Sequence, residues 1–239
     1  MEPHDKTASV APHGNVQYHA YTTEIGRNLP QGREEYYVYT PPNYDPKSST
    51  RYPVLYLLHG YDQNALGWQT HGNAAQVLDE LVAQGKARPM IVVMPYGYGD
   101  YKFFLAGKAV CLSPPRISEN VNLFAQMLLN EIIPQVDSDY RALTKREDRA
   151  IAGLSMGGRE AISIGLRNPR EFAWMGGFSA AFPDIERDPL TTITSKPTDI
   201  RLLWIAWTSW TAEFQRTSGN ARRPNGGWKS SRSKWRFRA

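Results

Sequence analysis

The sequence has few of the features that build disulfide scaffolds, metal clusters or membrane spans. It contains one cysteine, Cys111, which excludes an internal disulfide framework and a thiolate metal cluster. No apolar run reaches the roughly 18 residues of a membrane-spanning helix. Residues 1–15 are polar and lack the apolar stretch of a signal peptide, which leaves a cytoplasmic protein and the mature form of a secreted enzyme both open. With no metal-ligand cluster and no phosphate-binding loop of the Walker type, we expect no metal and no cofactor.

Histidine and the branched apolar residues are missing from the last part of the chain. The five histidines all precede residue 155, namely His4, His13, His19, His59 and His71. Residues 207–239 contain no Leu, Ile, Val or Met, and their only acid is Glu213. They hold four of the seven tryptophans among Arg, Ser and Gly. Such a segment lacks the apolar pattern of a buried helix or strand, so we expect an irregular tail.

The charge is divided unevenly along the chain. The 239 residues carry a net charge of +5, but residues 207–239 hold eight basic side chains against one acid, so the part before them is mildly acidic. A basic tail with interleaved tryptophans superficially suits nucleic acid, through phosphate neutralisation and base stacking. Because an acidic body precedes this tail, we expect no nucleic-acid partner. A basic-tailed interaction protein stays an alternative.

The apolar pattern predicts strands that alternate with helices. We expect strands at residues 34–39, 53–58, 89–95, 149–152, 172–178 and 202–206, and helices at residues 73–84, from Ser118 to about 136, and 159–166. Pro134 is expected to kink the second helix. The alternation indicates right-handed βαβ units and a mostly parallel sheet. Residues 1–33 are polar and are expected to cap the domain edge or fray, and residues 96–115 are expected to form a long loop.

The stretch at residues 151–158 reads I-A-G-L-S-M-G-G and carries the strongest chemical signal. Gly153, Ser155 and Gly157 fit G-x-S-x-G, the nucleophile elbow of α/β-hydrolases. The elbow is a sharp strand-to-helix turn, where side chains two residues before and after the serine would collide. The N–H of Met156 would then lie at a helix N-terminus, where negative charge on a substrate oxygen is stabilised. A glycine-rich turn in another doubly wound protein is the alternative interpretation.

Several motifs in succession resemble the putative-esterase family, which includes feruloyl esterases, acetyl xylan esterases and esterase D-like enzymes. They run from about residue 34 to residue 206 as Y-V-Y-T-P-P-N-Y, Y-L-L-H-G-Y, R-P-M-I-V-V-M-P-Y-G, E-I-I-P-Q-V, R-A-I-A-G-L-S-M-G-G and L-L-W-I-A. The resemblance implies an α/β-hydrolase fold, with Ser155 as nucleophile and the backbone N–H groups of Tyr61 and Met156 as oxyanion hole. It implies hydrolysis of a short acyl or feruloyl-type ester, either a small molecule or linked to polysaccharide. Arg159 departs from the family, whose members usually carry a small residue there.

The rest of the catalytic triad is not found in its expected positions. An acyl-transfer serine needs a histidine to take its proton and an acid to orient that histidine, and in α/β-hydrolases both follow the serine. The family's acid and histidine follow the strand that matches residues 202–206, and this chain has no His or Asp after Ala206. We therefore expect the last helix and strand of the fold to be missing. The abrupt change after Ala206 suggests a reading-frame shift, and a shifted frame of the coding DNA that restores an Asp and a His would support it.

Several roles stay open at this stage. His59 is expected to be structural and His71 a loop residue, but either is an alternative base, and Glu213 an alternative acid. The aromatic residues of 96–104 suit an acyl pocket for a phenolic acid or ordinary packing, and Cys111 suits a buried position. The alternative function is a catalytically impaired domain that binds esters or carbohydrate.

The expected organisation is a polar segment (1–33), an esterase domain (34–206) and a basic tail (207–239). Without its last strand the sheet should end in an apolar edge that lowers solubility or dimerises.

Overall fold

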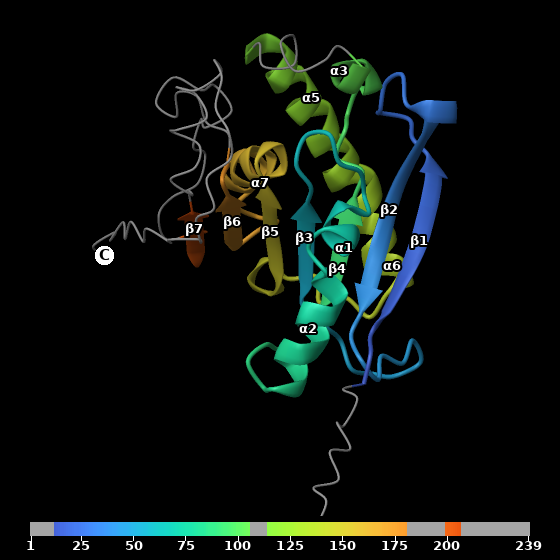
Figure 1. The fold of residues 1–239 in the computed structure, drawn as a ribbon, viewed down its shortest axis with the longest axis vertical. Coiled ribbons are helices and arrows are strands. Elements are labelled where there is room, and N and C mark those ends of the chain that lie inside the picture. Colours follow the sequence, from blue (N-terminus) through green and yellow to red (C-terminus); the bar gives the residue numbers. More distant parts are fainter. Residues whose placement is uncertain (1–11, 106–113, 181–198, 207–239) are drawn as a thin grey trace, which may run out of the picture.

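The computed structural model describes residues 12–105, 114–180 and 199–206. They contain a seven-stranded sheet in the order β1-β2-β4-β3-β5-β6-β7 (Figure 1). The strands are β1 (Asn15–Thr22), β2 (Arg33–Thr40), β3 (Val54–Leu58), β4 (Ile91–Pro95), β5 (Arg149–Leu154), β6 (Trp174–Phe178) and β7 (Leu202–Ala206). The helices are α1 (Gly67–Thr70), α2 (Ala74–Ala83), α3 (Tyr101–Leu105), α5 (Pro114–Met127), α6 (Ile133–Asp139) and α7 (Met156–Arg167). Short turns of other helix types are η1 (Pro30–Gly32), η2 (Leu128–Ile132) and η3 (Arg146–Asp148).

The five strands from β4 to β7 along the sheet are parallel, and β1 and β2 are antiparallel additions at one edge. Strand β3 pairs in parallel with both β4 and β5, and β6 joins β5 and β7 in the same sense. Strands β3, β4 and β5 are continuous apolar or small-residue runs because helices cover both of their faces. The predicted alternation of strands and helices and the mostly parallel sheet are confirmed.

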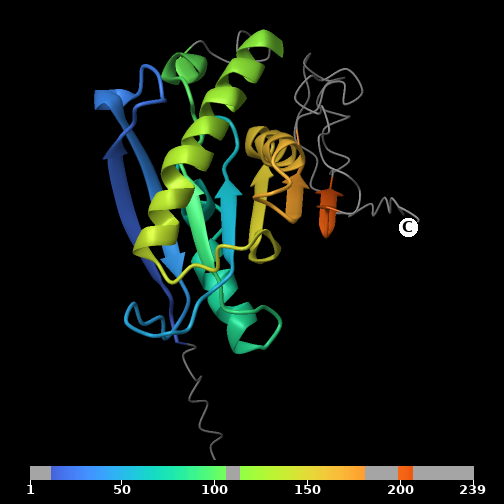
Figure 2. The same cartoon turned by 180° about the vertical axis from the view of Figure 1, so that it is seen from behind.

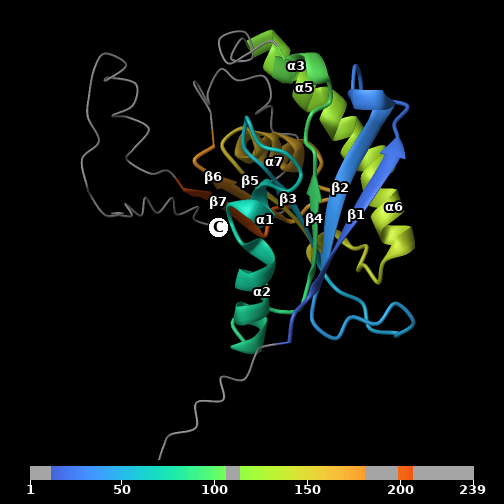
Figure 3. The same cartoon turned by 45° about the vertical axis from the view of Figure 1, so that its right-hand side comes forward.

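The helices form a layer on each face of the sheet. Figures 2 and 3 show α5, α6 and α7 on one face and α1 and α2 on the other. The larger core lies under α5 and α7 and contains Tyr56, Phe124 and Ile151, all fully buried. The smaller core lies under α2 and contains Val92 and Met94. The carboxyl ends of β3, β4, β5 and β6 therefore meet at one edge of the sheet, and the loops that follow them lie side by side.

The expectation for residues 1–33 is wrong for Asn15–Thr22, which forms strand β1. It pairs antiparallel with β2 from Asn15↔Thr40 to Thr22↔Arg33. The segment reads N-V-Q-Y-H-A-Y-T and has no clean alternation of polar and apolar residues, because no residue of this edge strand is fully buried and neither face demands apolar side chains. Pairing with β2 stabilises a strand that local preference does not indicate.

The expected long loop at residues 96–115 is wrong in two places. Helix α3 lies inside it, and α5 begins at Pro114, four residues before the predicted cap at Ser118. Proline suits the first turn of a helix, where no N–H is needed, so the Pro114–Pro115 pair starts the helix that it was expected to precede. The expectation for Cys111 falls on residues 106–113, outside the described part.

The helix departs from regular α-helical hydrogen bonding just before Pro134, and the kink itself stays a prediction. The π-helical turn η2 separates α5 from α6, and Pro134 stands in the first turn of α6. Proline has no N–H to bond the carbonyl of the preceding turn, so the regular ladder is interrupted there.

Candidate active site

Ser155 stands between β5 and α7 in a backbone conformation that a serine rarely adopts. Its φ is 54° and its ψ is −109°, and its N–H donates to the carbonyl of Phe178 at 2.8 Å. A non-glycine residue with positive φ is strained, and the surrounding structure must hold it there. The strand–turn–helix order that G-x-S-x-G predicts is present in the structure.

The two glycines of the motif are required by contacts that the structure shows. A Cβ on Gly153 would lie 2.4 Å from the carbonyl carbon and oxygen of Gly157. A Cβ on Gly157 would lie 2.4 Å from the carbonyl oxygen of His59, to which the Gly157 N–H donates at 3.1 Å. Both distances are too short for any side chain. The turn is therefore packed directly against the end of β3.

The loop after β3 lies beside Ser155. A Cβ on Gly60 would lie 3.7 Å from the Cβ of Ser155. The N–H of Gly60 donates to Oε1 of Gln63 at 2.8 Å, and the N–H of Gln63 donates back to the Gly60 carbonyl at 3.2 Å, so the loop is a tight turn. Tyr61 follows Gly60 in this loop, and Met156 is the first residue of α7. Met156 directly follows Ser155, and Tyr61 directly follows the glycine that borders it, while the role of their N–H groups stays a prediction.

His59 is directed at the backbone and not at Ser155. The residue is 2% exposed, its Nδ1 lies 2.8 Å from the Gly60 carbonyl oxygen, and its Nε2 faces the carbonyl oxygen of Tyr96. Burial lowers the pKa of the ring, and the two carbonyl oxygens oppose this shift. Because both nitrogens face carbonyl groups, neither is placed to take the proton of Ser155. The expected structural role fits this arrangement.

The other described histidines are also engaged elsewhere. His71 is exposed at the end of α1, with Nδ1 2.9 Å from Oγ1 of Thr70. His13 pairs with Asp79, and His19 lies near Tyr140, the residue that follows α6. In residues 12–105, 114–180 and 199–206 no histidine ring is hydrogen-bonded to Ser155. His4 and Glu213, like the whole tail at 207–239 with its expected irregularity and its missing last strand, lie outside the described residues.

The aromatic residues after β4 form a packed row. The ring of Tyr98 lies 5.5 Å from His59, 5.0 Å from Tyr96 and 6.3 Å from Phe103, and Phe103 lies 6.1 Å from Tyr61. Tyr98 is 0% and Phe103 5% exposed, so these two rings belong to the core. For them the packing interpretation holds. Tyr96 stays partly exposed at the edge of the sheet.

A second aromatic row reaches Ser155 from the α1 side. Phe178, whose carbonyl accepts the Ser155 N–H, has its ring 4.7 Å from Trp204 on β7 and 5.9 Å from Trp68 on α1. Trp204 is 43% exposed. The aromatic row therefore connects α1 with β6 and β7, and its exposed member is Trp204.

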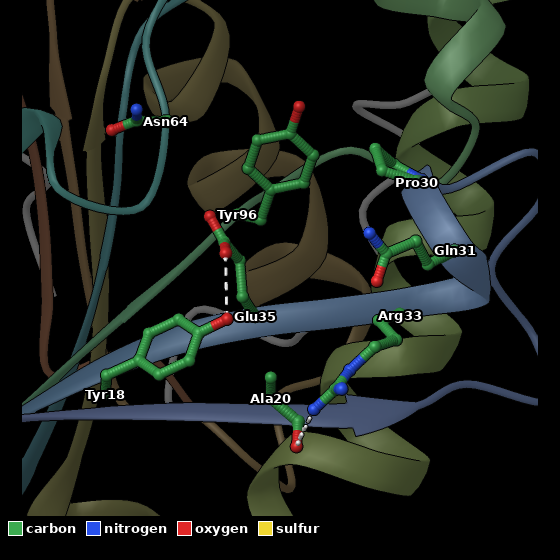
Figure 4. Close-up of a pocket in the computed structure, with 8 residues that line it drawn as sticks. All are labelled: Tyr18, Ala20, Pro30, Gln31, Arg33, Glu35, Asn64 and Tyr96. Carbon is green, nitrogen blue, oxygen red and sulfur yellow. Dashed lines mark hydrogen bonds between the residues drawn. The ribbon is translucent and has the colours of Figure 1, made fainter.

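A groove of about 490 Å³ opens at the same edge of the sheet, over β1 and β2 (Figure 4). It is lined by Tyr18, Ala20, Pro30, Gln31, Arg33, Glu35, Asn64 and Tyr96. Asn64 belongs to the loop that begins at Gly60, and the Tyr96 carbonyl faces His59, so the groove starts beyond the loop that borders Ser155. The sequence did not reveal it, because β1 supplies one wall and was not predicted.

Comparisons with known proteins find esterases. A family model described as "Putative esterase" matches residues 28–235. A protein named endo-1,4-beta-xylanase/feruloyl esterase from Xylanibacter ruminicola is 36% identical over 183 residues, which is 74% of this chain and 23% of that protein. An acetyl esterase from Caldicellulosiruptor saccharolyticus is 30% identical over 128 residues, 54% of this chain and 41% of that protein. The chain thus spans less than half the length of these two relatives.

Solved structures give the fold. A ferulic acid esterase from Anaeromyces mucronatus, in complex with ferulic acid, superposes with a TM-score of 0.61 at 25% identity, covering 74% of this chain and 61% of that chain. The same enzyme without substrate gives 0.63 at 24% identity, covering 74% and 62%. The arrangement of strands and helices around the serine is shared with these structures. No helix in the described residues is long and apolar enough to cross a membrane.

Proposed function

Because the chain belongs to the "Putative esterase" family and has its α/β-hydrolase fold, we propose that it hydrolyses carboxylic esters through an acyl-enzyme on Ser155. The observation that carries the proposal is the strained turn at Ser155 between β5 and α7, which aims a serine out of the sheet edge. A structural serine has no need of this conformation, since glycine would adopt it without strain.

Each step assigns a role to groups at the turn. The Oγ of Ser155 attacks the ester carbonyl and loses its proton, and the negative charge moves to the carbonyl oxygen. The N–H groups of Met156 and Tyr61 stabilise that charge, helped at Met156 by the positive end of the α7 dipole. A base takes up the Oγ proton and gives it to the alkoxide, which leaves as the alcohol, and water then hydrolyses the acyl-enzyme to the acid and free Ser155.

The proton acceptor decides how fast this chain reacts. In the part of the chain that the structure describes, no side chain is hydrogen-bonded to the Oγ of Ser155. Removing the histidine of a triad costs on the order of 10⁶ in kcat, while oxyanion hole and binding leave about 10³–10⁴ over water. A base from outside the described residues would give a fast enzyme, and its absence would give the impaired ester-binding domain that is the second candidate.

The test is hydrolysis of p-nitrophenyl acetate by the parent chain, by Ser155→Ala and by Ser163→Ala. Ser163 is a buried serine on the same helix and is a matched control for folding. We expect the parent and Ser163→Ala to react alike and Ser155→Ala to lose the activity. Equal, slow rates for all three would overturn the proposed hydrolysis by Ser155 and favour the impaired domain, which ester binding to Ser155→Ala would then support.

We also propose the substrate class, which is a short acyl or feruloyl-type ester whose alcohol is a small molecule or a saccharide. The names of the relative from Xylanibacter ruminicola and of the Anaeromyces mucronatus complex support the feruloyl group. The groove supports a polar alcohol, because Tyr18 and Tyr96 offer ring faces while Gln31 and Asn64 offer amide groups. The charges of Arg33 and Glu35 balance there.

The groove assignment is tested by comparing Tyr18→Ala with the parent on two feruloyl esters, one of methanol and one of an arabinose-containing oligosaccharide. If the alcohol lies in the groove, the KM for the oligosaccharide ester rises and the KM for the methyl ester stays the same. An equal change on both esters would count against the groove.

A further inference from the structure

Glu160 is a buried acid on the helix that begins at the nucleophile. It lies five residues after Ser155 on α7 and is 1% exposed. Its Oε1 accepts a hydrogen bond from Nδ2 of Asn120 at 3.2 Å, and its Oε2 has no hydrogen-bond partner. An acid enclosed in this way is expensive to ionise, and burial raises its pKa well above the usual range against the opposing effects of the Arg159 charge and the Asn120 bond.

Asn120 connects Glu160 with the loop that follows β4. Asn120 lies on α5, which packs beside α7 (Figure 2), and is itself 1% exposed. Its Oδ1 accepts the N–H of Gly99 at 3.0 Å and the N–H of Asp100 at 3.3 Å. The Asn120 amide therefore donates to a residue of α7 through its NH₂ group and accepts from the loop at residues 96–100 through its oxygen. A Cβ on Gly99 would lie 2.5 Å from the Cβ of Leu123, so the loop is in tight contact with α5.

The loop at residues 96–100 also contacts the ring of His59. The Tyr96 carbonyl faces Nε2 of His59, and Gly97 follows with a φ of 76°. A Cβ on Gly97 would lie 3.5 Å from Nε2 of His59 and 3.9 Å from Oε2 of Glu160, so the backbone of Gly97 is enclosed between these two groups. His59 precedes Gly60, which borders Ser155. The contacts thus run from the nucleophile helix through Glu160, Asn120 and the loop to the residue before Gly60.

We propose that Glu160 is a positioning residue, which holds residues 96–100 against α7 and thereby fixes His59 and the Gly60–Tyr61 turn beside Ser155. This inference rests on the proposed function where it concerns catalysis. The titratable groups that face the carboxyl are Arg159 on its own helix and Tyr98 and His59 on the loops opposite. The competing explanation is that Glu160 only fills the core.

The first experiment needs no activity. Hydrogen exchange of the Gly99 and Asp100 amides is followed in the parent, in Glu160→Ala, in Glu160→Gln and in Ser163→Ala, all within the full chain. We expect exchange about tenfold faster in Glu160→Ala, since Asn120 loses its anchor and the two N–H groups open more often. Glu160→Gln keeps an acceptor for Asn120 and should stay within about twofold of the parent. Ser163→Ala, one turn along the same buried face, should not change these amides.

The second experiment measures kcat and KM of the same variants on p-nitrophenyl acetate. We expect Glu160→Ala to lower kcat about tenfold with KM within about twofold, because a displaced turn misplaces the oxyanion donors while substrate binding is kept. Glu160→Gln should restore kcat. A variant that merely loses folded protein would lower the amplitude of active-site labelling and not the rate per labelled serine.

Two results would overturn the inference. One is unchanged exchange at Gly99 and Asp100 in Glu160→Ala, and the other is a Glu160→Gln variant as impaired as Glu160→Ala. If the parent shows no esterase activity, the proposed function fails and the amide exchange alone decides on Glu160, so the two failures remain distinguishable.

Discussion

At the scale of single residues, the site depends on glycines whose surroundings leave no room for a Cβ atom. Gly157 shows this most clearly, because its absent side chain is replaced by the carbonyl of His59. The serine two residues earlier can adopt its strained conformation only while α7 starts this close to β3. The glycine therefore acts on Ser155 through the backbone, although it has no chemistry of its own.

We predict that Gly157→Ala disrupts the site. The new Cβ would lie 2.4 Å from the His59 carbonyl oxygen, and either the helix or the strand end must move. A displacement of about 1 Å at reacting groups is enough to lose roughly 10²-fold in rate. The loss is measured as kcat/KM together with the circular dichroism of the variant. Gly85→Ala is the control, since nothing lies within 4 Å of its added Cβ and only its own φ of 66° is strained, and rates alike in the two variants would contradict the steric argument.

A second prediction at this scale concerns pH. Burial raises the pKa of Glu160 in the folded chain above the value of about 4.3 that it has when unfolded. The folded state therefore holds this proton more tightly, and the stability that it contributes is complete below about pH 4.3 and declines as pH rises toward the folded pKa. Glu160→Gln cannot ionise, so its free energy of unfolding should gain on that of the parent as pH increases. Urea unfolding of both chains from pH 4 to pH 8 measures this, and a constant difference would show that Glu160 ionises freely in the fold.

At the scale of elements, the central sheet is held to its helices by an ion cluster around a buried arginine at the start of β5. Arg149 is 3% exposed and donates to Asp137 of α6 at 2.7 Å and to Glu171, just before β6, at 2.5 Å. A single cation thus joins β5, a helix of one layer and the segment that leads into the neighbouring strand.

We predict that Arg149→Ala destabilises the fold by about 3–5 kcal/mol, because it leaves two carboxylates without their partner in a partly buried place. The exposed pair of Arg27 and Glu119 is the natural control, since both side chains are more than half exposed and Arg27→Ala should cost about 1 kcal/mol or less. Urea unfolding of the two variants gives the comparison. Equal losses would mean that the cluster at β5 is no stronger than a surface pair.

Elements with a strong local pattern were predictable from the sequence, and those made by their neighbours were not. Strands β3 and β4 are continuous apolar runs, and the elbow has a fixed spacing, so each carries its own signal. Strand β1 is polar and depends on pairing with β2. Helix α7 is buried from Gly157 to Leu166, including Arg159, Glu160 and Ser163, and no helical periodicity could identify an acid on it as part of the site.

The site was predictable to a similar degree. The place of Ser155 followed from its motif, and the loop carrying Tyr61 followed from the resemblance. The groove over β1 and β2 and the connection through Asn120 join residues that are 20 or more positions apart in the chain, and nothing in the local sequence marks such pairs. The direction of both His59 nitrogens toward carbonyl groups could be learned only from the fold.

At the scale of the whole molecule, β7 is the outermost strand at one edge of the sheet among the described residues. It pairs with β6, and within the described residues no strand pairs with its other side. Leu202 is 48% and Trp204 43% exposed on it. An uncovered apolar edge of this kind pairs with other chains.

We therefore predict that the chain self-associates and that Leu202→Lys reduces this, since charged residues on edge strands oppose strand pairing. Light scattering across a range of concentrations measures the effect. A parent chain that stays a monodisperse monomer at high concentration would contradict the prediction.

The strained backbone at Ser155 also affects which mutations are favoured once selection for activity is lost. A serine at φ 54° raises the free energy of the fold in every generation, whether or not the enzyme works. Glycine would relieve that strain. A lineage freed from selection for ester hydrolysis would therefore gain stability by the single substitution Ser155→Gly, which also removes the nucleophile. Inactive descendants of this architecture should consequently lose the serine early and keep the glycines around it.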